Sequence, residues 1–168
     1  MKNKLLKWQV FGAVFTGIMG VLLHFLYEWS GENIFVSLIS AVNESIWEHT
    51  KLIFFPMLFF GIIEYTALGK DFKSFVFTKT LGALLGITLI PALYYIINGV
   101  FGPTADWINI AIFFVTVAVV YLIETALLKK DKFELKPAWL PFVILTALVV
   151  LYIIFTFFPP QIPLFIEN

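Results

Sequence analysis

Long apolar runs alternate with short polar segments along the whole chain. A helix needs about 20 apolar residues to cross the hydrocarbon core of a bilayer, and five runs approach this length. The predicted spans are residues 8–27, 52–68, 80–97, 107–128 and 138–158. Pro159, Pro160 and Pro163 end the last span, because proline cannot continue a helix. The pattern predicts an all-α integral membrane protein with five transmembrane helices, forming a single transmembrane domain over residues 1–168.

Residues 34–48 are too short and too interrupted by polar positions to span a bilayer. At helical spacing, their polar and apolar side chains separate onto two faces, which is typical of an amphipathic helix. The sequence therefore predicts one amphipathic helix here, lying along the outer interface or packed as a lid on the bundle. One straight helix over residues 34–68 would be roughly 50 Å long, so a bend is needed, and Pro56 supplies a cause.

The composition supports a membrane protein and excludes several other classes. Of 168 residues, 61% are hydrophobic and 13% are charged, whereas soluble domains carry about 25% charged residues. Cysteine is absent, so disulfides, thiol nucleophiles and thiolate metal sites are excluded. The formal net charge is zero and no basic stripe is present, so nothing supports nucleic-acid binding. The lipid bilayer is the expected partner.

The positions of the lysines predict the orientation of the chain. With the N-terminus in the cytoplasm, ten of the eleven basic residues fall on the inner side and only Lys51 falls outside. The ten are Lys2, Lys4, Lys7, Lys70, Lys73, Lys79, Lys129, Lys130, Lys132 and Lys136. Inner loops of membrane proteins are enriched in basic residues. We therefore expect a multi-pass protein of the plasma (inner) membrane with a cytoplasmic N-terminus and an extracytoplasmic C-terminus.

Polar chemistry is concentrated directly before the second predicted span, at its outer end. The candidate ligand-binding residues are Asn43, Glu44, Trp47, Glu48, His49 and Lys51, together with His24 at the end of the first span. Carboxylates and imidazoles suit zinc, manganese or calcium, so His24, Glu44, Glu48 and His49 are candidate ligands of a divalent cation. On a regular helix His49 points about 140° away from Glu44, so these groups converge only if the helix breaks there.

The same block fits a simpler interpretation. Glu44, Glu48 and Lys51 follow one another at spacings of four and three residues, as on one helical face. Such residues form a solvated interfacial face whose ion pairs contribute a few tenths of a kcal/mol each. Both interpretations stay open at this stage.

Two further carboxylates, Glu64 and Glu124, lie in apolar surroundings near the inner ends of the second and fourth spans. Carboxylates inside a membrane are costly unless they are paired, and they often mark functional sites. They either handle charge or protons on the inner side, or reach the nearby Lys70, Lys129 and Lys130 at the cytoplasmic boundary.

The block Asn43-Glu44-Ser45-Ile46-Trp47-Glu48-His49-Thr50-Lys51-Leu52, followed by Phe54-Phe55-Pro56, carries a family resemblance. It resembles a family of small bacterial polytopic membrane proteins classed as a domain of unknown function. The resemblance implies a bacterial plasma-membrane protein whose defining feature is the outer polar block. It implies no activity.

Three functions are compatible with these residues. The leading hypothesis is a protein that binds or transports a small solute or cation through the outward-facing polar cluster. Five spans are few for a lone transporter, so a homo-oligomer or a partner subunit is expected. One alternative is a metal-dependent hydrolase of the outer leaflet, with metal on His24, Glu44 and His49 and with Glu48 as general base. The other is a non-catalytic assembly or immunity-type partner subunit.

Overall fold

The computed structural model describes residues 2–103, 105–132 and 136–167, and these residues form helices without strands. The helices are α1 (Lys2–Trp29), α2 (Ile34–Ser37), α3 (Ile46–Leu68), α4 (Phe75–Phe101), α5 (Asp106–Lys130), α6 (Leu140–Phe157) and the short 3₁₀ helix η1 (Pro163–Phe165). Five of them are long and apolar enough to cross a membrane. The prediction of an all-α protein with five candidate spans is confirmed, and the chain is a multi-pass membrane protein.

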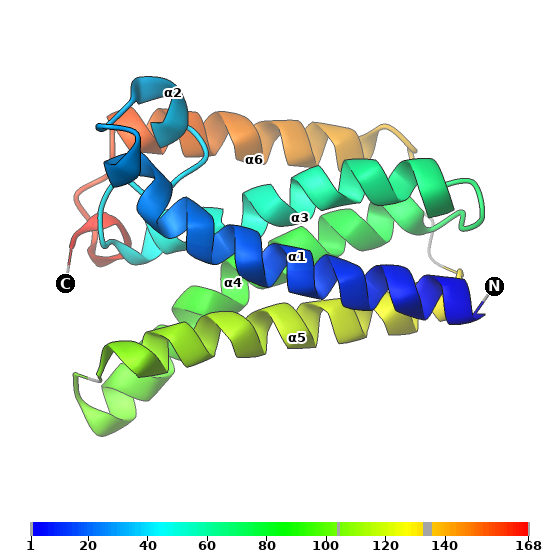
Figure 1. Cartoon of the computed structure of the whole chain (residues 1–168), viewed down its shortest axis with the longest axis horizontal. Helices are drawn as coiled ribbons and strands as arrows, with labels where there is room; N and C mark the ends of the chain where they lie inside the picture. The colour runs from blue at the N-terminus through cyan, green and yellow to red at the C-terminus, as the bar shows by residue number, and fades with distance from the viewer. Residues whose placement is uncertain (1, 104, 133–135, 168) are drawn as a thin grey trace.

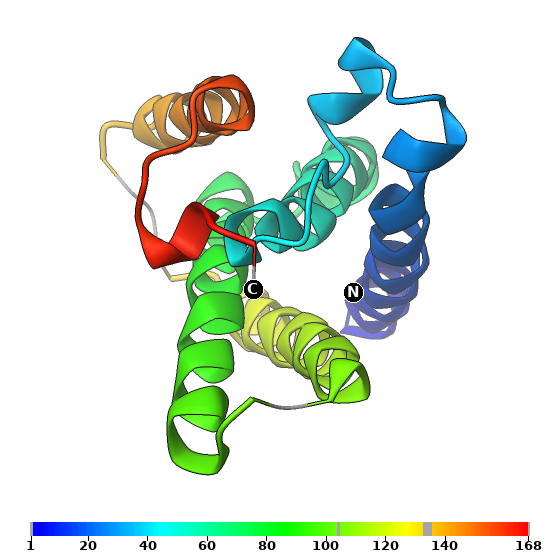
Figure 2. The ribbon, with the colours of Figure 1, turned by 90° about the vertical axis from the view of Figure 1, so that its left-hand side faces the viewer.

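Four of the long helices form a ring. Helix α3 packs against α1 and α4, and α5 packs against the same two helices, so α1, α3, α4 and α5 enclose a common interior (Figure 2). Helix α6 lies outside this ring and contacts α4. The N-terminus and the α3–α4 connection lie at one end of the bundle, and the C-terminus, α2 and the α4–α5 connection lie at the other (Figure 1). The termini are therefore at opposite ends.

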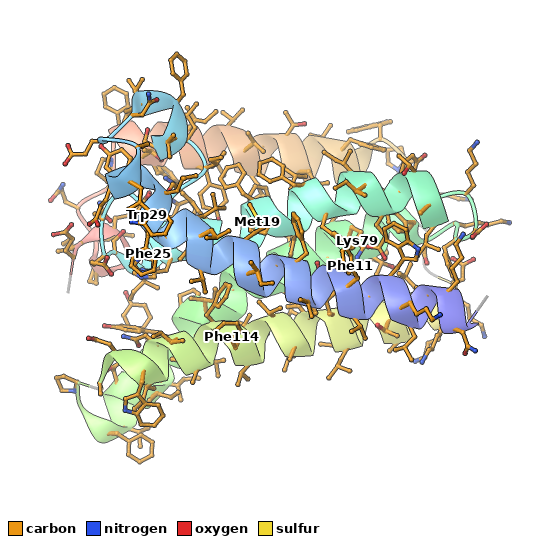
Figure 3. The ribbon with its side chains drawn as sticks, in the orientation of Figure 1. Phe11, Met19, Phe25, Trp29, Lys79 and Phe114 are labelled. Carbon is orange, nitrogen blue, oxygen red and sulfur yellow. The ribbon has the colours of Figure 1, made fainter. Side chains whose placement is uncertain are left out.

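Aromatic and aliphatic side chains fill the interior and also cover the outside. Ile53, Phe54 and Val120 are completely buried. Phe11 and Trp29 of α1, by contrast, are 62% and 66% exposed, and large apolar side chains project all around the helices (Figure 3). Such an apolar exterior is unfavourable in water, and it is consistent with contact with lipid.

The predicted amphipathic helix over residues 34–48 is wrong. Only Ile34–Ser37 is helical, and residues 38–45 form a turn and a loop before α3 begins at Ile46. The Ser40 hydroxyl donates to the carbonyl of Leu23 in α1, and Asn43 accepts a hydrogen bond from the Ser45 backbone N–H at 3.0 Å. Serine and asparagine side chains compete with helical hydrogen bonding in this way. This break, rather than a kink at Pro56, separates the polar segment from the span.

Side-chain hydrogen bonds fix the start of α3 and the end of α5. The Ser45 hydroxyl accepts from the Glu48 N–H at 3.4 Å, which caps the N-terminus of α3. At the other end of the bundle, Asp131 follows α5 and accepts hydrogen bonds from the backbone N–H and hydroxyl of Ser74. Partial burial raises the pKa of Asp131, but the hydrogen bonds from Ser74 outweigh this and leave that pKa below its usual value.

Close packing of α1 on α3 depends on Gly20. A Cβ at this position would lie 2.7 Å from the Leu52 carbonyl oxygen and would also collide with the Phe113 ring. In a helix, alanine is normally more stable than glycine by about 1 kcal/mol. In Gly20→Ala, however, the added Cβ forces α1 away from α3, at a cost of about 1–3 kcal/mol. We expect Gly20→Ala to lower the thermal unfolding midpoint in detergent.

Gly61 in α3 provides the matched control, because a Cβ there would have no neighbour within 4 Å. Gly61→Ala is expected to leave the midpoint unchanged or to raise it. Equal effects of the two substitutions would show that close packing at Gly20 does not contribute to stability.

Candidate functional site

The structure divides the predicted polar block into two separate groups. His24, Glu44 and His49 come together at the surface of the bundle end, and this set is called the outer triad below. Glu48 and Lys51 lie behind it as a buried ion pair. The seven candidate ligand residues therefore do not form one site.

The outer triad converges because the chain breaks before α3. His24 comes from α1, Glu44 from the loop and His49 from the first turn of α3. The Glu44 Oε2 atom lies 3.3 Å from His49 Nε2 and 3.9 Å from His24 Nε2. One ligand atom of each residue lies within 4.8 Å of the others. The three side chains remain partly accessible, at 31%, 64% and 29% for His24, Glu44 and His49.

The hydrogen bonds of His49 leave a position for a cation between it and Glu44. His49 Nδ1 lies 2.9 Å from the carbonyl oxygen of Ser45, which only accepts, so Nδ1 carries the hydrogen. In a neutral imidazole, Nε2 then directs its lone pair at the Glu44 carboxylate, 3.3 Å away. Two acceptors in this position repel each other unless a proton or a metal ion lies between them. A backbone carbonyl on the distal nitrogen is also the usual support of a metal-bound histidine.

A cavity of about 780 Å³ opens beside the outer triad, enclosed by α1, α3, α4 and α5. His24, Glu44 and His49 contribute to its wall, and its other polar side chains come from the opposite helices. These are Tyr94, Asn98, Asp106 and Asn109. Asn109 Oδ1 is buried and has no hydrogen-bond partner within the part of the chain that is described. The cavity therefore combines apolar walls with a few polar groups, as small-molecule sites do.

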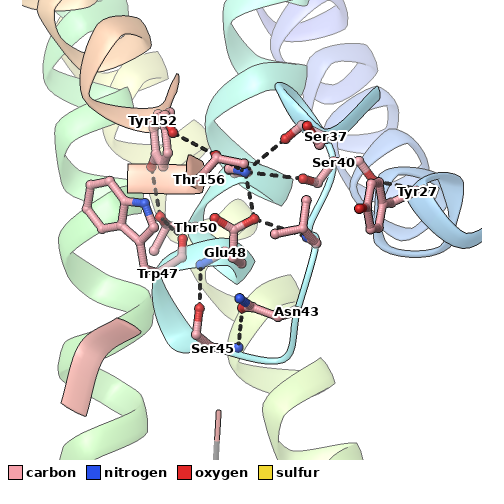
Figure 4. Close-up of polar contacts among 12 residues, drawn as sticks. Tyr27, Ser37, Ser40, Asn43, Ser45, Trp47, Glu48, Thr50, Tyr152 and Thr156 are labelled. Carbon is pink, nitrogen blue, oxygen red and sulfur yellow. Dashed lines mark hydrogen bonds and ion pairs between the residues drawn. The ribbon is translucent and has the colours of Figure 1, made fainter. Parts of the chain in front are cut away.

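Glu48 and Lys51 are joined in a buried network of hydrogen bonds (Figure 4). Lys51 Nζ lies 2.6 Å from Glu48 Oε2 and 2.6 Å from Thr156 Oγ1, and it also donates to the carbonyls of Ser37 and Ser40. Glu48 is 3% exposed and Lys51 is fully buried. The interpretation of these two residues as a solvated face is therefore wrong. The pair joins the loop, α3 and α6.

Asn43 and Trp47, the remaining predicted ligand residues, also support the local fold. Asn43 stabilises the turn before α3 through its contact with Ser45. The Trp47 ring packs against Tyr152 of α6 and Phe165 of η1, with centroid distances of 4.8 and 4.9 Å. Neither residue lines the cavity.

At the end of the bundle that carries the N-terminus, Glu64 and Glu124 meet on a single lysine that the sequence alone does not single out as their partner. Both carboxylates contact Lys79 Nζ at 2.6 Å, rather than the predicted lysines of the connecting segments. The predicted spans leave Lys79 in a connecting loop, but α4 begins at Phe75 and carries Lys79 into the bundle (Figure 3). Two carboxylates in an apolar setting require a cation nearby. Lys79 follows the apolar residues Phe75, Val76 and Phe77, and this setting indicates that it can lie inside the bundle as that cation.

Comparison with known proteins adds a family but no activity. No curated protein and no solved structure matches the chain significantly. One family covers residues 1–168 and is described as a family of unknown function. The resemblance to an uncharacterised family is therefore confirmed, and the chain belongs to the family of unknown function DUF6512.

Proposed function

We propose that this protein binds a divalent transition-metal cation, such as zinc, at the outer triad, as the capture step of a cation-binding or transport function. The observation that supports this most directly is the contact between His49 Nε2 and Glu44 Oε2. Because His49 donates its Nδ1 hydrogen to Ser45, a neutral His49 and Glu44 form a pair of acceptors that a proton or a metal ion must bridge.

The distances fit a tetrahedral ion. Metal–ligand bonds of 2.0–2.1 Å place tetrahedral ligand atoms about 3.3–3.4 Å apart. The Glu44–His49 distance of 3.3 Å matches this value. The Glu44–His24 distance is 3.9 Å and the three ligand atoms lie within 4.8 Å of one another, so His24 must rotate toward the other two to complete the site. Two imidazoles favour zinc over magnesium or calcium, which prefer oxygen ligands. Three protein ligands leave a fourth position for water or a solute from the cavity.

The lysines support an outward-facing site. Nine of the eleven lysines belong to the first turns of α1, the α3–α4 connection, the last turn of α5 and the segment that joins α5 to α6. They are Lys2, Lys4, Lys7, Lys70, Lys73, Lys129, Lys130, Lys132 and Lys136. The N-terminus and the α3–α4 connection lie at the same end of the bundle (Figure 1). The positive-inside rule places this end in the cytoplasm. The outer triad and the C-terminus then face the exterior of a plasma membrane, which in the bacterial setting implied by the sequence resemblance is the inner membrane.

Passage across the membrane requires more than this ring. Below the cavity, the interior is filled by buried side chains that include Val117, Val120 and Tyr121. Transport therefore requires a conformational change, or a path completed by a second copy or a partner subunit.

The hydrolase alternative loses its general base in this geometry. Glu48 Oε2 accepts from Lys51 Nζ at 2.6 Å and from the Val42 N–H at 3.0 Å, and Glu48 does not line the cavity beside the outer triad, so this carboxylate is already paired with a buried cation. Metal binding without hydrolysis is the better-supported function. The partner-subunit alternative predicts instead a copurifying protein and an outer triad without metal.

Isothermal titration calorimetry of the purified, metal-free protein in detergent, with Zn²⁺ as the titrant, tests the proposal. We expect one site per chain, with affinity at least about 10-fold weaker in Glu44→Gln and in His49→Ala, because each variant loses a ligand. Glu28→Gln is the matched control, since Glu28 lies one turn after His24 in α1 and does not line the cavity. Absence of binding, or equal affinity in all four proteins, would contradict the proposal.

A further inference from the structure

A second ionisable cluster is buried inside the ring at the lysine-rich end. Lys79 Nζ of α4 lies 2.6 Å from Glu64 Oε2 of α3 and 2.6 Å from Glu124 Oε2 of α5. Gln9 of α1 donates to Glu64 Oε1 at 2.7 Å, so all four helices of the ring contribute. Glu64 and Glu124 are completely buried, and the Lys79 side chain is 10% exposed.

The charges of this cluster do not balance. With both carboxylates ionised and Lys79 protonated, the buried cluster has a net charge of −1, which is costly in a low-dielectric interior. The remaining polar neighbours add no positive charge. Tyr121 presents its ring face 5.1 Å from Lys79 Nζ, and its hydroxyl is hydrogen-bonded to Thr16 at 2.8 Å. The Phe75 ring lies 5.8 Å from the same nitrogen. One additional proton makes the cluster neutral.

The contacts indicate which carboxyl group holds that proton. Glu64 is stabilised as an anion by Gln9 as well as by Lys79. Each Oε2 atom contacts Lys79 alone, so the two groups differ at Oε1: that of Glu64 accepts from Gln9, whereas that of Glu124 is buried without a hydrogen-bond partner among the described residues. Glu124 Oε1 lies against Gly82, where a Cβ would collide with it. Glu124 is therefore the less stabilised anion of the two.

We infer that the Glu64–Lys79–Glu124 cluster is a proton-binding site that holds one exchangeable proton on Glu124. Release of the proton from Glu124 Oε1 to water changes the net charge of the cluster from 0 to −1. Every ring helix contributes to the cluster, so this change alters the electrostatic energy of helix packing at the inner end of the bundle. The inference requires no metal at the outer triad.

Infrared spectroscopy of the purified protein near neutral pH counts protonated carboxyl groups directly, through their C=O stretching band and its shift in D₂O. We expect a band equivalent to one group in the wild type. It should be absent from Glu124→Gln, and also from Glu64→Gln, because one carboxylate then balances Lys79 without a proton. In Lys79→Met the band should double, since both carboxyl groups lose their cation. Glu48→Gln is the control and should leave the band unchanged.

Conservative variants test the position of the proton. Glu124→Asp should shift the band, whereas Glu64→Asp should leave its position unchanged; the reverse result would overturn the assignment to Glu124. A wild-type protein without the band, or with a band insensitive to both glutamine variants, would overturn the proton site itself. His49→Ala should lose zinc affinity and keep the band, so this inference and the metal proposal fail independently. Circular dichroism and size exclusion establish that each variant is folded.

Discussion

Replacement of Lys51 by alanine is expected to lower the free energy of unfolding by about 3–5 kcal/mol. This is the usual cost of leaving one partner of a buried ion pair without its counter-charge. Glu48 would remain in the interior at 3% exposure, and the carbonyls of Ser37 and Ser40 would lose their donor. Thr156 would lose its contact too, so α6 would be held less firmly at this end. Unfolding by SDS in mixed micelles, followed by tryptophan fluorescence, measures the change.

The double variant Lys51→Met/Glu48→Leu separates the charge effect from general disruption. It removes both charges and retains much of the volume, so it should be considerably more stable than Lys51→Ala. A double variant as unstable as the single one would show that the hydrogen bonds to the loop, rather than the uncompensated carboxylate, dominate. Because Glu44 is carried by the same loop, Lys51→Ala should also weaken zinc binding at the outer triad without removing a ligand.

The five long helices were predictable because a bilayer imposes a minimum length of apolar sequence on any helix that crosses it. The ends of the helices were less predictable. Helix α4 begins at Phe75, five residues before the predicted span, and so carries Lys79 inside the bundle. The positive-inside rule counts lysines on each side of a membrane. It does not identify a lysine that two distant carboxylates hold in the interior.

The outer triad shows a different limit of sequence analysis. The sequence indicated that Glu44 and His49 converge only if the helix over residues 34–48 breaks, but the hydrophobic periodicity favoured an unbroken helix. The contacts that decide the matter are tertiary: Ser40 with Leu23 of α1, and Lys51 with the carbonyl of Ser37. Local pattern alone does not contain them, since they depend on how α1 and α3 pack. The residue types of the site were predictable, and its division into a surface triad and a buried pair was not.

Substitution of Lys79 by methionine should produce the second large loss of stability, again at least about 3 kcal/mol at neutral pH. In the wild type, each of the two carboxylates lies 2.6 Å from Lys79 Nζ. In the variant, Glu64 and Glu124 would share the same buried site without a cation. Both must then be protonated in the folded protein, so the carboxyl groups of the folded variant hold two protons where those of the folded wild type hold one. In the unfolded chain near neutral pH these carboxyl groups are ionised in both proteins. Stability increases as pH falls wherever the folded state binds more protons than the unfolded state.

The stability of Lys79→Met should therefore rise more steeply than that of the wild type as pH is lowered from neutral. The difference is up to about 1.4 kcal/mol per pH unit, the value for one proton. It should disappear near pH 4, where the carboxyl groups of the unfolded chain are protonated too. The triple variant Lys79→Met/Glu64→Gln/Glu124→Gln carries no charge in the cluster and should lose this extra pH dependence. If Lys79→Met has the stability and pH profile of the wild type, the amine does not compensate the two carboxylates, and the charge count on which the proton site rests is wrong.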